Sequence, residues 1–87
     1  MEIKAGSVVR STAGRDKGGL FIVMSADDVY AYLADGDMRK TDRPKKKKLK
    51  HIQASEKSSE FIYNKLTAGQ KVTNAELRKA LAEMVLR

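Results

Sequence analysis

A short, uninterrupted apolar segment constrains this chain more than any other feature of its sequence. Residues 20–24 (LFIVM) are all apolar and rich in β-forming residue types. Gly18 and Gly19 precede the segment, and Asp27 and Asp28 follow it, so turn-forming residues bound it on both sides. A run of this length is too short for a typical helix, and a strand without polar alternation is typically buried on both faces. The segment therefore predicts a central strand covered on both sides.

Three further segments have the composition of short strands. In residues 29–33 (VYAYL), Val29, Ala31 and Leu33 share one face, while the two tyrosines share the other. The Asp-Gly pair that follows this segment is a strong turn signal. Short strands at this spacing are typical of a small closed or half-closed barrel. The predicted strands are residues 8–12, 20–24, 29–33 and 49–53.

The C-terminal part of the chain changes to a helical pattern. Ser55 is a suitable N-cap for a helix that runs to about Leu66, and Gly69 is a suitable stop. Thr73 and Glu76 have the spacing of a capping box, in which each side chain satisfies a backbone N–H at the start of a second helix. We expect the two helices to form an antiparallel hairpin or to pack separately on the barrel.

The second helix carries one apolar stripe at helical spacing. Val72 and Leu77 are placed to form a hydrophobic staple at its start. One interpretation of the stripe is packing within this chain, and the other is a docking face for a partner. We predict mostly β structure with an α-helical appendage, divided into residues 1–54 and 55–87. The stripe consists of Leu77, Ala80, Leu81, Met84 and Val85.

The positive charge is concentrated in one window of the sequence. The chain has 18 basic and 11 acidic residues, which give a formal net charge of +7. Residues 39–50 contain eight basic residues and one acid, Asp42, so this window accounts for the whole net charge. A local positive field attracts polyanions such as nucleic acid or an acidic membrane surface. A solvated loop and a targeting signal are alternative interpretations of the same charge.

Several classes of functional site lack the residues that they need. The chain has no cysteine, which excludes disulfides, thiolate metal sites and cysteine nucleophiles. His51 is the single histidine and cannot make a typical zinc site alone. The aspartates at positions 27, 28, 35 and 37 lack the spacing of a calcium loop and fit turns. No nucleophile–base pair or cofactor fingerprint is evident, so we predict no metal, no cofactor and no enzymatic activity.

The arrangement of Gly6, Val8 and Gly14-x-x-Lys17-Gly18, followed by the apolar strand at residues 21–24, resembles the KOW motif. That motif forms two strands and their connecting loop in an SH3-like barrel of ribosomal and transcription-elongation proteins. The order that follows, VYAYLADGDMRK and then PKKKKLKHIQ, is similar to the archaeal and eukaryotic KOW-type large-subunit ribosomal proteins, the family that includes ribosomal protein fourteen of the e-type. The resemblance covers residues 6–53 and implies a small SH3-like barrel, with the helical hairpin outside it. The matching motif positions are Gly6, Val8, Gly14, Lys17 and Gly18.

The resemblance also implies RNA binding. Gly14 implies a turn and Gly18 a close approach of backbone to RNA, with Arg15 and Lys17 at the loop tip. The basic window is expected to form a loop held between barrel strands, so that it acts as a fixed charged rim with little base discrimination. The tyrosines of residues 29–33 either stack on bases or cover the barrel against the helices. The predicted RNA-binding residues are Arg10, Gly14, Arg15, Lys17, Gly18, Arg39, Lys40, Arg43, Lys45, Lys46, Lys47, Lys48, Lys50 and His51.

We therefore predict a non-enzymatic, ribosome-associated protein whose partner is RNA, specifically rRNA. The alternative is a KOW protein-interaction module that uses its C-terminal helices to bind ribosomal or transcription proteins. A third interpretation of residues 44–50 is a nuclear localisation signal. No segment approaches the roughly 20 apolar residues of a membrane span, and the first residues lack an apolar signal core. We accordingly expect a soluble, monomeric, cytoplasmic protein with no membrane partner.

Overall fold

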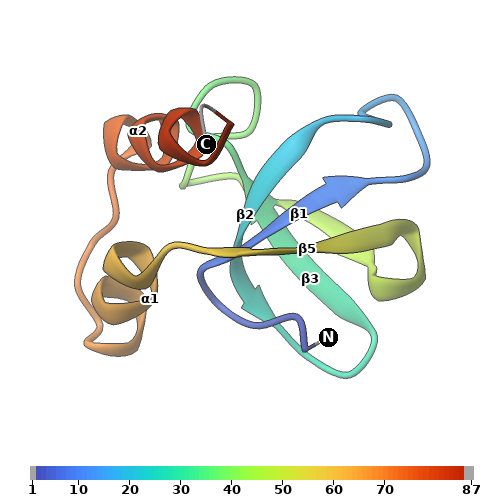
Figure 1. Ribbon diagram of the computed structural model, residues 1–87. Helices are drawn as coiled ribbons and strands as arrows, with labels where there is room; N and C mark the ends of the chain where they lie inside the picture. Colours follow the sequence, from blue (N-terminus) through green and yellow to red (C-terminus); the bar gives the residue numbers. More distant parts are fainter. Residues whose placement is uncertain (1, 86–87) are drawn as a thin grey trace.

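The fold consists of five strands followed by two helices. A computed structural model describes the chain over residues 2–85 (Figure 1). A 3₁₀ turn at Leu49–His51 joins the last two strands. This order confirms the predicted mostly β structure with an α-helical appendage. The elements are β1 (Ser7–Ser11), β2 (Leu20–Ala26), β3 (Tyr30–Ala34), β4 (Lys45–Lys48), β5 (Ile52–Ser58), α1 (Glu60–Thr67) and α2 (Asn74–Val85).

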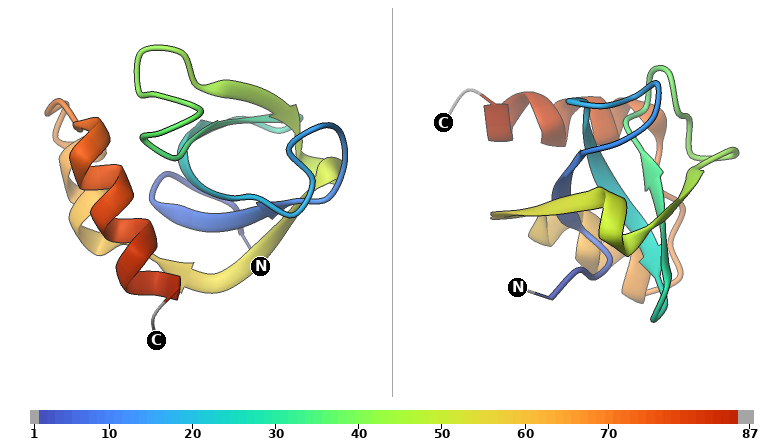
Figure 2. Two further views of the ribbon diagram at one scale, coloured as in Figure 1. Left: turned by 90° about the horizontal axis from the view of Figure 1, so that it is seen from above. Right: turned by 90° about the vertical axis from the view of Figure 1, so that its right-hand side faces the viewer.

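All five strands belong to one antiparallel sheet in the order β4-β3-β2-β1-β5. Register shifts occur in β1 between Ser7 and Val9 and in β2 between Val23 and Ser25. Such irregularities bend a strand and increase its twist, and the sheet curls around one of its faces (Figure 2). Among the described strands, no ladder returns from β5 to β4, so the sheet is open. The predicted closure into an SH3-like barrel is therefore not confirmed.

The central strand β2 is buried on both faces, as its apolar run predicts. Phe21 and Val23 pack in the concave face of the curled sheet, in a cluster that includes Val9 and Leu33. Ile22 points to the opposite, convex face and packs in a second cluster, which contains residues of both helices. The two clusters use alternate residues of one strand, because successive side chains point to opposite faces.

Both helices cover the convex face of the sheet (Figure 2). Ile62 of α1 and Leu77 of α2 are fully buried there against Val8 and Ile22 of the sheet. The apolar stripe of α2 is therefore part of the core of this chain, which is the first of the two interpretations of it. The stripe residues in this cluster or packed against it are Leu77, Ala80, Leu81 and Met84, while the side chain of Val85 lies outside the described residues.

The predicted boundary signals between the helices are confirmed. The N–H of Thr73 donates to Glu76 Oε1 at 2.9 Å, and the N–H of Glu76 donates to Thr73 Oγ1 at 3.1 Å, which completes the capping box. At the end of α1, Gly69 has a φ of 73°. The N–H groups of Gly69 and Gln70 donate to carbonyl oxygens of the last helical turn at 3.2 and 2.8 Å, as in a Schellman motif.

The predicted start of the first helix at Ser55 is wrong. Ser55 lies inside β5, and its hydroxyl donates to the carbonyl oxygen of Val8 at 2.6 Å. The N-cap is Ser59, whose Oγ accepts from the N–H of Ile62 at 3.2 Å. Both serines are suitable caps by residue type. Pairing of β5 with β1 over residues 52–58 decides between them, because it keeps the chain extended past Ser55.

The lysine run also differs from its prediction. Residues 45–48 were expected to form a loop, and they form β4, with Lys45 opposite Leu33 and Lys48 opposite Tyr30. Residues 49–51, expected to begin a strand, form the 3₁₀ turn, and β5 starts at Ile52. Lysine has a low β propensity, so the sequence gives little sign of this strand. Its place at the edge of the sheet suits it, since lysines discourage pairing with other chains.

The strand predicted at residues 29–33 is present with both ends shifted by one residue, as β3 spans Tyr30–Ala34. Ala31 and Leu33 are fully buried, as the alternation predicts. Val29 was expected on the same face, but it precedes the strand and is 53% exposed. The carboxylate of Asp27 explains this, because its Oδ1 accepts from the N–H groups of Val29 and Tyr30 at 2.8 and 2.7 Å and holds both in a turn.

The loop between β3 and β4 packs against the start of α2. The guanidinium of Arg78 donates to the carbonyl oxygen of Gly36 at 2.6 Å, and the N–H of Thr41 donates to Asn74 Oδ1 at 2.8 Å. Gly36 has a φ of 79°, and a Cβ at this position would overlap the carbonyl oxygen of Asn74. Gly36 therefore permits both the turn and the contact between loop and helix.

Substitution of Gly36 by alanine is expected to destabilise the protein more than the same change at Gly69. Both glycines have positive φ, which costs an alanine roughly 1 kcal/mol. A Cβ at Gly69 meets nothing within 4 Å, whereas one at Gly36 collides with the backbone of α2. Urea unfolding of the two variants separates the cost of φ from that of the collision. Equal losses in the free energy of unfolding would contradict the close approach of loop and helix.

Candidate nucleic-acid interface

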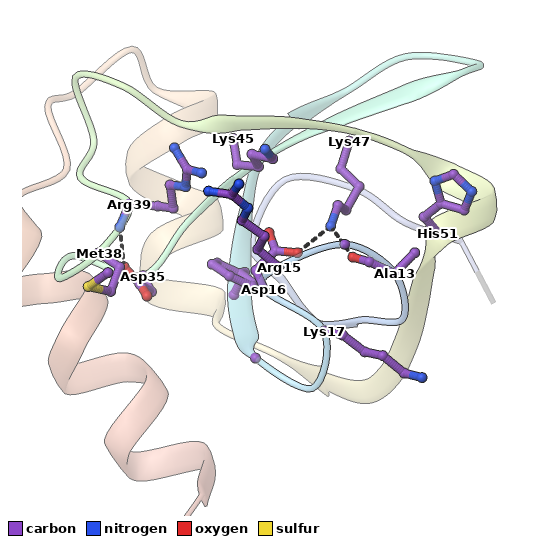
Figure 3. A pocket seen from close by; sticks show the side chains of 13 residues that line it. Ala13, Arg15, Asp16, Lys17, Asp35, Met38, Arg39, Lys45, Lys47 and His51 are labelled. Atoms are coloured by element: carbon purple, nitrogen blue, oxygen red, sulfur yellow. Dashed lines mark hydrogen bonds and ion pairs between the residues drawn. The ribbon is translucent and has the colours of Figure 1, made fainter.

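A groove of about 870 Å³ lies between the β1–β2 loop, the β3–β4 loop and β4 (Figure 3). Phe21 and Met38 contribute apolar surface to it. The positively charged lining residues outnumber the two aspartates among them. The lining residues are Ala13, Gly14, Arg15, Asp16, Lys17, Gly19, Phe21, Asp35, Met38, Arg39, Lys45, Lys47 and His51.

Two glycines shape the β1–β2 loop at one wall of the groove. Gly14 and Gly18 have φ values of 84° and 88°, a region that side chains rarely permit. The N–H of Gly18 donates to the carbonyl oxygen of Ser11 at 2.8 Å, and the guanidinium of Arg10 donates to the carbonyl oxygen of Gly18 at 2.6 Å. A Cβ at Gly18 would meet nothing within 4 Å, so no part of the described chain covers the loop there.

Lys47 is buried, in contrast to its neighbours Lys46 and Lys48 on β4. Its ammonium group donates to Ser11 Oγ at 2.8 Å, to the carbonyl oxygen of Ala13 at 2.6 Å and to Asp16 Oδ1. Lysine has three donors, and each has an acceptor here. The Lys47 side chain therefore connects β4 to β1 and to the β1–β2 loop, although β4 and β1 are not neighbours in the sheet.

The carboxyl group of Asp16 remains ionised in this network. Burial alone raises its pKa, but the hydrogen bonds from Lys47 and Ser11 and the charge of Lys47 outweigh burial, so the pKa is lowered. Oδ1 accepts from both side chains, while Oδ2 is buried without a partner in the described structure. The pair of opposite charges neutralises Lys47, which leaves that lysine without charge to offer a polyanion.

The other four cations of the groove have no ion-pair partner within the described residues. The guanidinium groups of Arg15 and Arg39 and the ammonium group of Lys45 lie near one another at one end of the groove, whereas Lys17 points away from them (Figure 3). Asp35 is the carboxylate of the β3–β4 loop that lines the groove. Its Oδ1 accepts from the N–H groups of Asp37 and Arg39 at 2.9 and 2.8 Å, and this carboxylate thereby shapes the turn.

The groove brings together half of the residues that the sequence indicated. Lys47 is the member that is withdrawn from solvent, with 8% of its side chain exposed. The predicted residues that line the groove are Gly14, Arg15, Lys17, Arg39, Lys45, Lys47 and His51. Those that lie outside it, all exposed, are Arg10, Gly18, Lys40, Arg43, Lys46, Lys48 and Lys50.

The sequence analysis missed the apolar part of the groove. Met38 is 83% exposed beside the cations, and Phe21 was assigned to the core alone. A single methionine in a polar loop gives almost no signal, because isolated exposed apolar residues are common on protein surfaces. Its relevance depends on the fold, which places residue 38 next to a loop more than twenty positions earlier in the chain.

Within residues 2–85, no group of three or more histidine, aspartate or glutamate side chains is placed to bind a metal ion. Neither helix of the described chain has the length and apolarity that a membrane span requires. In comparisons with known proteins, no family model and no curated protein matches the chain. The chemistry of the candidate site therefore has to be judged from the groove itself.

Replacement of Lys47 by methionine is expected to cost about 2 kcal/mol of unfolding free energy at neutral pH, because it leaves the half-buried Asp16 carboxylate without its cation. Lys46→Met on the same strand is the matched control. Its side chain is exposed, and the expected change is within about 0.5 kcal/mol. Urea unfolding of both variants measures the difference. Equal stabilities would contradict the structural role of Lys47.

The pH dependence of the free energy of unfolding tests the same ion pair of Lys47 and Asp16. Because the pKa of Asp16 is lowered in the folded protein, its contribution to stability is complete above the unfolded value of about 3.9 and declines as the pH falls below it. The Asp27 and Glu76 carboxyls also have lowered pKa values, so the relevant quantity is the difference between wild type and Asp16→Asn. That difference is expected to shrink between pH 5 and roughly pH 2. A constant difference would contradict the ionised state of Asp16.

Proposed function

We propose that the protein binds RNA through the groove, as a non-enzymatic protein associated with the ribosome. The observation that carries this proposal is the convergence of Arg15, Arg39 and Lys45 from three separate segments. None of these cations is neutralised by an ion pair within the described chain. A polyanion that places its phosphates there displaces condensed counterions, which is a favourable and salt-dependent contribution to binding.

The chemistry of the groove favours recognition of the RNA backbone. Arginine can contact phosphate through two parallel hydrogen bonds, whereas lysine acts as a point charge. The exposed Met38 offers apolar surface beside these cations, against which a sugar or base can pack. Within the described chain, the lining of the groove includes no asparagine or glutamine, whose amide groups pair a donor with an acceptor, so we propose recognition by backbone and shape.

We also propose that the curled sheet is a KOW-type SH3-like barrel. The positive φ values of Gly14 and Gly18 support this, because the resemblance assigns them a turn and a close approach to RNA. A Cβ at Gly18 would meet nothing within 4 Å, so a ligand can approach the loop backbone there, which also supports the proposal. The choice of rRNA rests on the resemblance to ribosomal KOW proteins, which we extend to this chain as a proposal together with a cytoplasmic location.

The alternative, a protein-interaction module that uses its C-terminal helices, has less support. This alternative requires that the apolar stripe of α2 is free to dock a partner. Leu77 is fully buried, and Ala80 is 6% exposed, against the convex face of the sheet. A partner helix therefore has no access to the centre of the stripe unless α2 leaves the sheet. We retain RNA binding as the function that the site supports best.

The variant Arg15→Ala/Lys45→Ala is expected to weaken binding of an rRNA fragment and to reduce its salt dependence. Each phosphate contact contributes about 0.7 to 0.9 to the slope of log affinity against log salt concentration, so the slope should shrink by roughly 1.4 to 1.8. Titration by fluorescence anisotropy at several salt concentrations measures both quantities. Duplex DNA of the same length, titrated in parallel, measures the preference for RNA.

The matched control is Lys71→Ala/Lys79→Ala, which removes the same charge from exposed positions outside the groove. A loss confined to the groove variant supports the proposed site. Equal losses of RNA affinity in the two variants would show that only net charge matters, which would contradict a site in the groove. Absence of RNA binding by the wild-type protein at low salt would overturn the proposed function itself.

A further inference from the structure

The strand β4 has a second charged face that the groove does not use. Successive side chains of a strand point to opposite faces, so Lys45 and Lys47 point toward the groove while Lys46 and Lys48 point away from it. Lys46 and Lys48 are exposed, and no ion pair to them is formed within the described residues. The register between β3 and β4 determines which residues of β3 lie beside Lys46 and Lys48 on this face.

Two tyrosines of β3 share this outer face. Tyr32 is the cross-strand partner of Lys46, and Tyr30 is the partner of Lys48. Both rings are half-buried, and neither belongs to the concave core or to the cluster under the helices. The interpretation that these tyrosines cover the barrel against the helices therefore lacks support. We call the surface of Tyr30, Tyr32, Lys46 and Lys48 the tyrosine–lysine face.

The helices leave the tyrosine–lysine face uncovered. They pack on β1, β2 and the end of β3 through Val8, Ile22 and Ala34. In Figure 2, β4 lies on the far side of the curled sheet from both helices. A hollow of about 410 Å³ adjoins the face and is lined by Asp28, Val29, Lys48, Leu49 and Lys50. Apolar surface and two cations therefore continue beyond the strand, together with one carboxylate.

We propose that the tyrosine–lysine face binds single-stranded RNA by stacking of unpaired bases on Tyr30 and Tyr32, with phosphates at Lys46 and Lys48. The proposal rests on the proposed function and adds a second surface, which selects for unpaired nucleotides. Aromatic rings stack on any base, and neighbouring lysines hold the backbone without reading sequence. A duplex cannot use the tyrosines, because its bases are already stacked within the helix.

Two existing contacts have to be compatible with this binding. The ammonium group of Lys46 lies 4.2 Å from the centroid of the Tyr30 ring. An exposed cation–π contact is weaker than base stacking, and the long lysine side chain can move aside to meet a phosphate. Asp27 is the acidic neighbour of Lys46, and its carboxylate is engaged with two backbone N–H groups of the turn.

The charge and aromatic content of the face have a simpler explanation. Lysines on an edge strand prevent pairing with other chains, and tyrosines shield the backbone of β3. That explanation predicts no difference between single-stranded and duplex RNA. It also predicts that the tyrosines can be replaced by other β-forming residues without effect on RNA affinity.

The test uses a labelled oligouridylate of about 12 nucleotides and an RNA hairpin duplex of similar charge. Tyr30→Ile/Tyr32→Ile keeps strand-forming residues, and Tyr63→Leu on α1 is the matched control. The tyrosine double variant is expected to lose about tenfold or more in affinity for oligouridylate, with a smaller loss for the duplex. Equal losses for both RNAs, or none, would overturn the proposal.

Intrinsic fluorescence gives an independent readout that does not depend on the double variant folding normally. The chain has no tryptophan and three tyrosines, so in Tyr63→Leu all emission comes from Tyr30 and Tyr32. Stacked oligouridylate is expected to quench this emission, and the duplex is not. Binding by anisotropy without quenching would overturn this inference and leave the groove intact. No binding of either RNA would overturn the proposed function as well.

Discussion

The contacts of the Lys47 ammonium group with Ser11, Ala13 and Asp16 hold the walls of the groove together. The sheet is open, with β4 and β5 as its unpaired edges, so no ladder fixes β4 against the far side of the concave face. Lys47 supplies that connection through three hydrogen bonds to β1 and the β1–β2 loop. The same bonds set the position of the loop that bears Arg15. The groove therefore depends on a lysine that does not itself face solvent.

The strand conformation of the lysine run explains how one run serves several purposes. Four consecutive lysines in a loop would all extend into water, whereas in β4 they alternate between the two faces. Lys47 joins the interior, Lys45 lines the groove, and Lys46 and Lys48 occupy the outer face beside the tyrosines. The strand fixes the backbone of each lysine, so this part of the chain does not have to be ordered when a phosphate binds.

Local signals in the sequence were sufficient to predict those elements whose conformation depends on neighbouring residues alone. The apolar run predicted β2 and its burial on both faces, and the capping box of Thr73 and Glu76 predicted the start of α2. Ser55 was misassigned because its residue type permits a cap, while pairing of β5 with β1 overrides that preference. The predicted boundary between residues 54 and 55, the RNA partner and the monomeric state stay predictions.

The strand conformation and the burial of the lysines at residues 45–48 could not be predicted from the sequence, for a different reason. Lysine disfavours strands, and only the pairing of residues 45–48 with β3 makes them extended. The burial of Lys47 depends on Asp16, which lies 31 residues away in the sequence and is brought near by the curl of the sheet. Charge counting singled out the basic window of residues 39–50, but it assigned Lys47 to the exposed cations. The contribution of Met38 to the groove depends on the same tertiary arrangement.

Nuclear magnetic resonance of the lysine ammonium groups, in protein labelled with ¹⁵N at lysine, tests the central claim most directly. Hydrogen bonding and burial should slow proton exchange at Lys47, so its ammonium signal should persist where those of Lys45, Lys46 and Lys48 are lost to exchange. Added RNA should leave the Lys47 signal in place. Equally fast exchange at all four lysines, or a large effect of RNA on Lys47, would contradict the account.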